Sequence, residues 1–229
     1  PLPSTFGSGR HRRQKHIRLR INSDGQITVS APTGTSRAKI QGILRNKEGW
    51  LASKLRETSQ ALEQYNTTKK VYVDGMPYIV EFQFSDQSTY KLDVDHNRQY
   101  ILVYGPEENQ AQLSGVLGRW LRREAKQRLV NYAQLISKEV GIPYKKLFLR
   151  NQKTRWGSSS TLGNISLNWR TVMIPTPVQR YLIIHELAHQ QYMNHSARFW
   201  KEVIYYCPDY KQHELWLKQN RALMGLFRS

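Results

Sequence analysis

The stretch His185-Glu186-Leu187-Ala188-His189 decides how this sequence is interpreted. Residues i and i+4 of an α-helix lie on one face about one turn apart, so both imidazoles can bind one metal ion. Glu186 follows the first histidine and can take a proton from a water molecule on that metal. The pattern H-E-x-x-H is a signature of zinc metallopeptidases, although a pattern this short also arises by chance.

The residues around this stretch predict a helix with one apolar face. Thr176 is a suitable N-cap and Pro177 a suitable first helical residue. Apolar residues and both histidines then recur at helical spacing, on a stripe formed by Val178, Tyr181, Leu182, His185, Ala188, His189 and Tyr192. We therefore expect the histidines to face the protein interior or a cleft in it.

A catalytic zinc site has three protein ligands and keeps one position open for water. His195 is the predicted third ligand, because Asn194 can adopt the left-handed conformation that ends a helix and so return the chain to the metal. Ser196 would cap the next helix. A buried histidine is usually a hydrogen-bonded core residue, but that explanation fits three histidines and a glutamate in this arrangement poorly. The alternative ligands are Glu202 and, more weakly, His213 and Glu214.

Length and composition are those of a soluble globular protein with one large or two small domains. The chain has 229 residues, 39% of them hydrophobic, and a mean hydropathy of −0.66. No apolar run approaches the roughly 20 residues of a transmembrane helix, and no secretory signal is visible at the start. The single cysteine, Cys207, excludes intramolecular disulfides and is interpreted as a small buried side chain. These features predict a cytoplasmic location.

The chain is strongly basic, with 35 Lys and Arg against 17 Asp and Glu and a formal net charge of +18. Basic residues crowd the N-terminal stretch (Arg10, Arg12, Arg13, Lys15, Arg18, Arg20) and a central segment (Arg119, Arg122, Arg123, Lys126, Arg128). Such a charge attracts polyanions, so nucleic acid is a possible partner besides a protein or peptide substrate. A solvated basic surface without a partner is the alternative, and no membrane partner is expected. No helix-turn-helix, zinc-finger or RNA-recognition signature is present.

The first half of the chain predicts a flexible basic segment, residues 1–15, followed by a β-rich module, residues 16–105. Alternating apolar residues predict a β-hairpin whose turn is Ser23-Asp24-Gly25. Ser36 is the predicted cap of one helix that runs through Trp50 to Leu55. Further strands are predicted at 70–73, 78–84, 90–94 and 100–104, the first two joined by Asp74-Gly75.

Residues 106–229 predict a second domain. It begins with a long helix at 108–140 that Gly141 ends. Strands are predicted at 147–150 and 163–170, with residues 155–161 as the loop between them. The second strand precedes the histidine helix, and its free edge could pair with an extended peptide.

Several motifs of this half resemble those of YgjP-like predicted metal-dependent hydrolases, a family similar to the SprT-like and WLM zinc peptidases. They are Arg155-Trp156-Gly157-Ser158, Asn164–Arg170, His185–His189, Asn194-His195-Ser196 with Phe199-Trp200, and Cys207-Pro208-Asp209-Tyr210. The resemblance implies an α+β fold, in which the mostly β module precedes a zincin-like metallopeptidase domain. It also implies Zn²⁺ as cofactor, His185, His189 and His195 as its ligands, and Glu186 as general base. Ser159 stands where the family often has cysteine, and Tyr192 occupies the glycine position of the metzincins.

The predicted function is hydrolysis of peptide bonds by a zinc-activated water whose proton Glu186 accepts. Four residues are candidates to bind substrate: Arg155, Asn168, Tyr181 and Tyr192. Arg155, Tyr181 and Tyr192 are also candidates to stabilise the oxyanion. Two other functions stay open: a nucleic-acid-associated protein that cuts proteins on DNA, as the SprT-like proteins suggest, and a non-catalytic scaffold that a metal stabilises.

Overall fold

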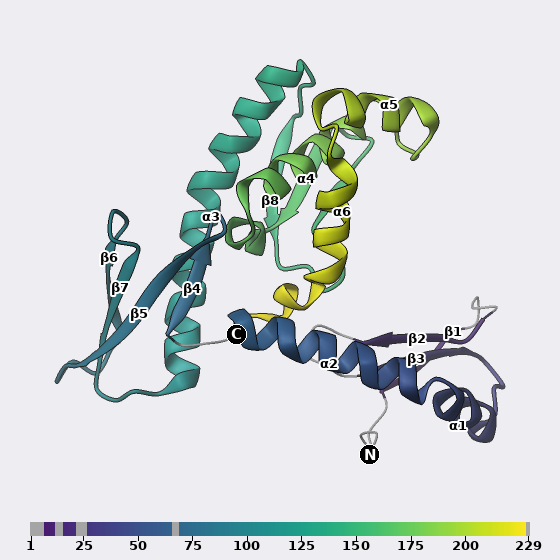
Figure 1. Ribbon diagram of the computed structural model, residues 1–229, viewed down its shortest axis with the longest axis horizontal. Coiled ribbons are helices and arrows are strands. Elements are labelled where there is room, and N and C mark those ends of the chain that lie inside the picture. Colours follow the sequence, from purple (N-terminus) through teal and green to yellow (C-terminus); the bar gives the residue numbers. More distant parts are fainter. Residues whose placement is uncertain (1–6, 12–15, 22–26, 66–68, 228–229) are drawn as a thin grey trace.

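The computed structural model describes residues 7–11, 16–21, 27–65 and 69–227, which fold into three β-sheets and six α-helices (Figure 1). The mixed α+β class predicted from the sequence is therefore confirmed. A smaller lobe, built from the described residues between 7 and 65, lies to one side of a larger body (Figure 1). None of the helices within the described residues combines the length and apolar character that a transmembrane span requires.

The smaller lobe begins with a three-stranded sheet of order β1-β3-β2. Its strands are β1 (Gly7–His11), β2 (Arg18–Ile21) and β3 (Ile27–Pro32). The antiparallel pairing of β2 with β3 confirms the predicted hairpin, whose turn lies outside the described residues. Residues 7–11 were expected to be flexible, but they pair in parallel with β3. This pairing is possible because β2 occupies only one edge of β3 and the other edge is open to β1. The rest of the predicted flexible segment, residues 1–6 and 12–15, lies outside the described residues.

Two helices, α1 (Arg37–Asn46) and α2 (Glu48–Tyr65), replace the single helix that the sequence predicts. Ser36 caps α1 as expected, since its hydroxyl accepts a hydrogen bond from the backbone N–H of Lys39 at 3.3 Å. The chain bends at Lys47. The bend allows Leu44 of α1 and Leu51 of α2 to share one small core, which they form with Ile27 and Val29.

A second sheet, of order β4-β5-β7-β6, follows. Its strands are β4 (Lys70–Val73), β5 (Met76–Phe84), β6 (Lys91–Asp95) and β7 (Tyr100–Gly105), close to the predicted ranges. Asp74 and Gly75 form the predicted turn with φ of 54° and 81°. A Cβ atom on Gly75 would lie 2.8 Å from Cα of Pro175, so glycine allows this turn to pack against the start of the histidine helix.

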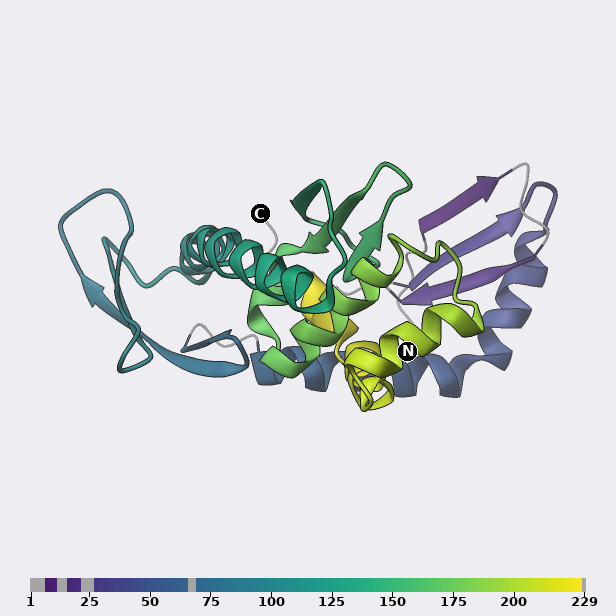
Figure 2. The same ribbon diagram turned by 90° about the horizontal axis from the view of Figure 1, so that it is seen from above.

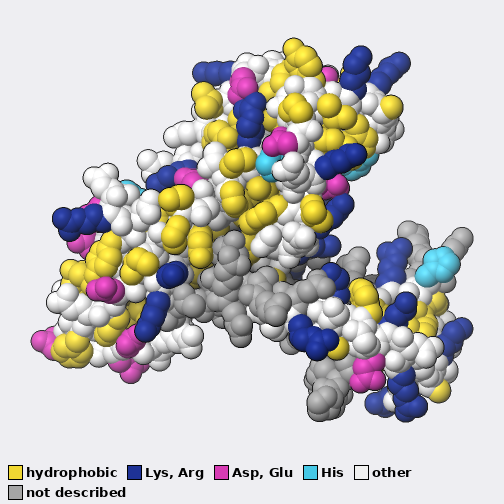
Figure 3. Space-filling model, viewed as in Figure 1, with side chains coloured by type: hydrophobic (Ala, Val, Ile, Leu, Met, Phe, Trp, Pro, Cys, Tyr) yellow, Lys and Arg dark blue, Asp and Glu magenta, His cyan; other side chains and the backbone are white. Residues whose placement is uncertain are grey.

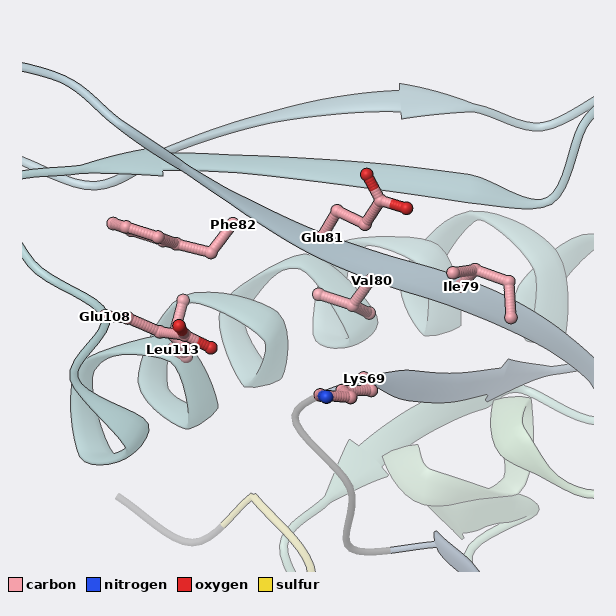
Figure 4. A pocket seen from close by; sticks show the side chains of 7 residues that line it. All are labelled: Lys69, Ile79, Val80, Glu81, Phe82, Glu108 and Leu113. Carbon is pink, nitrogen blue, oxygen red and sulfur yellow. The ribbon is translucent and has the colours of Figure 1, made fainter.

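A pocket of about 390 Å³ lies where β5 meets the start of the long helix α3 (Gln110–Val140) (Figure 4). Its lining is Lys69, Ile79, Val80, Glu81, Phe82, Glu108 and Leu113. No histidine or cysteine is among these side chains. The pocket thus belongs to the sheet and α3, and it lacks the nitrogen and sulfur ligands of a zinc site.

The long helix begins two residues after its predicted start and ends at Val140 as predicted. The side chain of Asn109 accepts hydrogen bonds from the backbone N–H groups of Ala111 and Gln112, and Gly141 ends α3 in the left-handed conformation at φ 69°. A third sheet of order β8-β10-β9 follows, with β8 (Lys146–Arg150), β9 (Gly157–Ser159) and β10 (Asn164–Asn168). Strand β9 lies within the segment predicted to be a loop. β10 has β8 on one side and β9 on the other, so the predicted free edge of this strand is wrong.

Three helices complete the larger body: α4 (Thr176–Ala188), α5 (Ala197–Tyr206) and α6 (Tyr210–Gln219). Short 3-10 helices lie at Trp169–Met173 and Arg221–Gly225. Figure 2 shows α3 between the sheet of β5 and the group formed by α4, α5 and α6. One hydrophobic cluster joins buried residues of β4, β5 and β7 to those of α3 and α4. The domain boundary predicted between residues 105 and 106 therefore falls inside one core, and the separate small core is that of the N-terminal lobe.

Candidate metal centre

The three predicted histidines meet at the end of α4. Their nearest ring nitrogens all lie within 4.8 Å of one another, and Nε2 of His195 is 3.2 Å from Nε2 of His185. Two nitrogens bound to one tetrahedral zinc at roughly 2.0–2.1 Å are separated by roughly 3.3 Å. The observed spacing therefore fits a single metal ion that all three imidazoles reach.

His195 returns to this place by a different route from the one predicted. Asn194 is not among the residues with positive φ, so its predicted left-handed conformation is wrong. Instead, α4 ends at Ala188, and the N–H groups of Gln190 and Tyr192 donate to the carbonyls of Leu187 and Ala188 at 2.8 and 2.9 Å. These turn hydrogen bonds reverse the chain. Ser196 then caps α5, as expected, through a 3.5 Å hydrogen bond from the N–H of Phe199.

Each imidazole has a neighbour that holds its orientation. Nδ1 of His189 lies 2.9 Å from the carbonyl oxygen of Tyr192, so this nitrogen carries the proton and Nε2 is the atom free to bind a metal. The hydroxyl of Tyr181 lies 3.5 Å from Nδ1 of His185. The ring of His195 stacks on Trp200, with centroids 5.6 Å apart.

The surroundings of His185 and His189 favour the neutral form that a metal requires. Burial, together with the positive charges that His189 and His195 would carry, lowers the pKa of His185 to about 3. Burial also lowers the pKa of His189. Protonated imidazoles would repel one another here, whereas neutral imidazoles offer three lone pairs to one cation.

Glu186 is the buried carboxylate of this centre, with only 4% of its surface exposed. Its Oε2 atom has no hydrogen-bond partner among the described residues. Burial raises the pKa of Glu186 to about 8, and the positive charge of Arg155 opposes this rise. A carboxylate without a partner is costly inside a protein. The position of Glu186 next to the histidines is therefore better explained by binding of a water molecule or a metal than by a structural role.

The comparison of the sequence with known families agrees with this geometry. Residues 15–220 match the family of the YgjP-like, metallopeptidase domain. The chain belongs to the YgjP-like family. Membership supports a metal-dependent peptidase, and hence a hydrolase that uses a metal cofactor.

Two further comparisons add little to this assignment. Among solved structures, the chain is similar to the crystal structure of the metallopeptidase zymogen of Pyrococcus abyssi abylysin, with 22% identity and a TM-score of 0.37. The match covers 40% of this chain and 93% of that chain. A likeness this low carries no argument. No curated protein matches the chain.

In this YgjP-like chain, the four predicted substrate-binding residues lie in different surroundings. Arg155 is exposed and interacts electrostatically with Glu186, and Tyr192 is half-buried. Asn168 is fully buried: its amide donates to the carbonyl of Gln152 at 2.8 Å and accepts from the N–H of Arg170 at 3.1 Å. We therefore assign Asn168 a structural part and leave it out of the proposed substrate site.

Tyr181 is also buried, with 2% of its surface exposed, and its hydroxyl meets His185 at Nδ1, whereas Nε2 faces His195. Its ring packs between that of His185 and those of Tyr210 and His213, at centroid distances of 5.8, 6.4 and 6.1 Å. This position suits a residue that orients a metal ligand better than one that contacts substrate.

Sequence reasoning missed the role of Gly157 in β9. This residue lies against the carboxyl group of Glu186, so closely that a Cβ atom there would come within 2.8 Å of Cδ. Ser159 of the same strand accepts a hydrogen bond from the side chain of Gln190, just after α4. The glycine in Arg155-Trp156-Gly157-Ser158 was the available signal, since an isolated glycine in a strand often marks the close approach of another group.

The alternative ligands do not join the three histidines. Neither Glu202 nor Glu214 belongs to a group of metal-ligand atoms among the described residues. His213 belongs to a second group, with Cys207 and Asp209, in which the thiol donates to Asp209 at 3.3 Å and Nε2 of His213 lies 3.0 Å from the same carboxylate. Burial raises the pKa of Cys207 to about 12, so the thiolate that a metal needs is disfavoured.

The hydroxyl of Tyr181 is expected to strengthen metal binding. Tyr181→Phe removes the group beside Nδ1 of His185 and should weaken zinc affinity by about 10-fold, the lower end of the range for groups that support a metal ligand. Competition with a zinc-chelating dye measures this. Tyr192→Phe is the matched control. Tyr192 supports His189 through its backbone carbonyl, which this substitution leaves in place. Equal affinities of the two variants would contradict the role of Tyr181.

Gly157→Ala is expected to displace the carboxyl group of Glu186, since the new methyl group has no room beside it. We expect at least a 10-fold loss of activity, since displacing a catalytic group by about 1 Å costs up to 100-fold. Ser158→Ala, at the next position of β9, is the control, and its activity should change less than 3-fold. Peptide cleavage by metal-loaded protein is the measurement, and full activity of Gly157→Ala would show that this contact is unimportant.

The raised pKa of the buried Glu186 carboxyl group also predicts that the stability of the metal-free protein depends on pH. Its pKa is about 8 in the folded protein against an ordinary value of 4.5, so the folded state holds a proton that the unfolded chain releases. The contribution of Glu186 to stability is therefore present below pH 4.5 and is lost as the pH rises through about 8. Urea unfolding in the presence of a chelator should show the stability of the wild type falling across this window relative to Glu186→Gln. A constant difference between the two proteins would contradict the raised pKa.

Proposed function

We propose that the protein is a zinc-dependent peptidase in which His185, His189 and His195 bind the metal and Glu186 is the general base. The observation that carries the proposal is the buried Oε2 of Glu186, which has no hydrogen-bond partner among the described residues and directly follows the first of three converging histidines. Three imidazoles also bind other transition metals, but neutral nitrogen ligands with one open position are typical of catalytic zinc.

The chain's own residues have distinct tasks in this mechanism. Zinc, when bound, supplies a Lewis acid and lowers the pKa of a coordinated water towards about 7. Glu186 accepts the proton of the attacking water and then passes it to the leaving amine. Its raised pKa suits both steps, because a group that titrates near neutral pH can take up and release a proton. Arg155 is the candidate to stabilise the developing oxyanion, since it is exposed and its charge acts on Glu186.

The substrate is proposed to bind along β9. This strand is at the edge of its sheet, contacts α4, and includes the glycine that lies against Glu186. An extended peptide that pairs with β9 would bring its backbone past the catalytic carboxylate. The predicted pairing of a peptide with β10 is wrong, because β9 covers that edge, and the pairing with β9 is a new proposal.

The test is cleavage of casein and of a peptide library by protein whose metal content is known. Elemental analysis should find about one zinc per chain, and mass spectrometry should find cleavage products. Chelation should abolish cleavage but leave most helical circular dichroism, because α4 is packed by apolar residues of the main core. Zinc-loaded protein that cleaves nothing would contradict the peptidase, and unfolding on chelation would favour a metal-stabilised scaffold.

A further inference from the structure

Trp50 is the exposed tryptophan of this chain. All six tryptophans lie within the described residues, and three of them, Trp120, Trp156 and Trp169, are at most 7% exposed. Trp50 is 48% exposed, although its position in sequence predicted an apolar helix face. It is also absent from the small core of Ile27, Val29, Leu44 and Leu51. Among the described side chains of the lobe, core packing therefore does not explain this large ring at the surface.

The lobe that carries Trp50 is the most basic part of the chain. Residues 1–65 contain 12 Lys and Arg against 4 Asp and Glu, whereas residues 66–229 contain 23 against 13. Arg37, Lys39, Arg45 and Lys47 are exposed, and none of them forms an ion pair among the described residues. In the larger body, by contrast, Arg128, Arg180 and Lys218 each pair with a carboxylate.

The bend between α1 and α2, which we call the α1–α2 corner, carries three exposed residues close together in sequence: Arg45, Lys47 and Trp50. Lys47 immediately precedes α2, and Trp50 lies in the first turn of that helix, three residues later. The corner forms one end of the molecule in both ribbon views (Figures 1 and 2). On the face shown in Figure 3, the charged side chains of this lobe are mostly basic.

We propose that the α1–α2 corner binds single-stranded nucleic acid, with a base stacked on Trp50 and phosphates held by Arg45 and Lys47. An aromatic ring beside cations is the combination by which proteins bind unpaired bases. Stacking requires a base that is not already paired within a duplex, so a single strand fits better than a double helix. This inference goes beyond the proposed peptidase and does not depend on it.

A membrane surface fits the corner less well. Interfacial binding needs a broad apolar face that enters the lipid. Trp50 is the one exposed large hydrophobic residue among the described side chains of residues 16–65, so an apolar face is lacking there. A single ring supplies one stacking platform, which suits a base, but too little apolar area to hold a lipid bilayer.

Fluorescence anisotropy of the full chain with a labelled oligothymidylate of about 20 nucleotides tests the proposal. Trp50→Ala should weaken binding by about 5- to 150-fold, whereas Trp50→Phe, which keeps a ring, should lose much less. The double variant Arg45→Glu/Lys47→Glu should reduce the slope of log K against log salt by about 1.4, the value for two lost phosphate contacts on a single strand. Lys91→Glu, an exposed lysine of β6, is the matched control and should bind as the wild type does.

Circular dichroism of each variant confirms that the lobe is folded. The proposal is overturned if Trp50→Ala and the double variant bind the oligonucleotide as tightly as the wild type. It is equally overturned if the wild type binds phosphatidylserine vesicles and leaves the oligonucleotide unbound. Loss of binding in Trp50→Ala but not in Lys91→Glu supports it, and so does a smaller salt dependence of the double variant.

Discussion

Glu186→Gln is expected to lower peptide hydrolysis by about 10²- to 10⁴-fold, the usual contribution of a general base. The amide has almost the shape of the carboxyl group, but it cannot accept the proton of the attacking water. Zinc content should stay near that of the wild type, because the three histidine nitrogens are unchanged. Initial rates on a fluorogenic peptide and elemental analysis of the same samples measure the two quantities.

The neighbours of Glu186 make this variant easy to interpret. Oε2 has no partner among the described residues, so the amide that replaces it breaks no hydrogen bond there. A neutral side chain at a position that is 4% exposed should also stabilise the folded state above pH 8, where the wild-type carboxyl group is charged. A variant that is more stable but inactive indicates a catalytic residue, whereas one that turns over peptide at the wild-type rate would rule out this base.

His195→Ala is expected to weaken zinc binding by more than about 100-fold, since removing even a group that supports a ligand costs 10- to 100-fold. Peptidase activity at limiting zinc should fall with it. His195 is exposed, in contrast to His185 and His189, so its removal leaves the packing of α4 intact. Calorimetric titration with zinc, together with a thermal unfolding curve, separates loss of the ligand from loss of the fold.

Glu202→Ala is the matched control for this experiment, because Glu202 was the other predicted third ligand and lies on α5, soon after His195. It should keep the zinc affinity of the wild type. If Glu202→Ala lost the metal and His195→Ala retained it, the assignment of the third ligand would be reversed. Loss in both variants would mean that α5 as a whole positions the site.

Local patterns predicted most of the elements and the central part of the metal centre. The pair His185 and His189 depends only on the spacing of a helix, and alternating apolar residues predicted β4 to β7. The capping roles of Ser36 and Ser196 were also predicted, since a cap depends on residues within one turn.

The errors concern contacts between distant segments. Local patterns also gave no sign that Asn168 and Tyr181, two candidates for substrate binding, are buried. β9 was assigned to a loop because three residues are too few to show an alternating pattern. α1 and α2 were expected to be one helix, because periodicity continues across Lys47 although the small core requires a bend there.

By itself, the sequence determined the helix that presents two histidines and a glutamate, because hydrogen bonds and side-chain spacing within a helix are local. Only the tertiary structure decided that Gly157 lies against Glu186, and that Trp50 stays exposed. Burial and close approach depend on which segments distant in sequence pack together, and a local sequence pattern does not specify that packing.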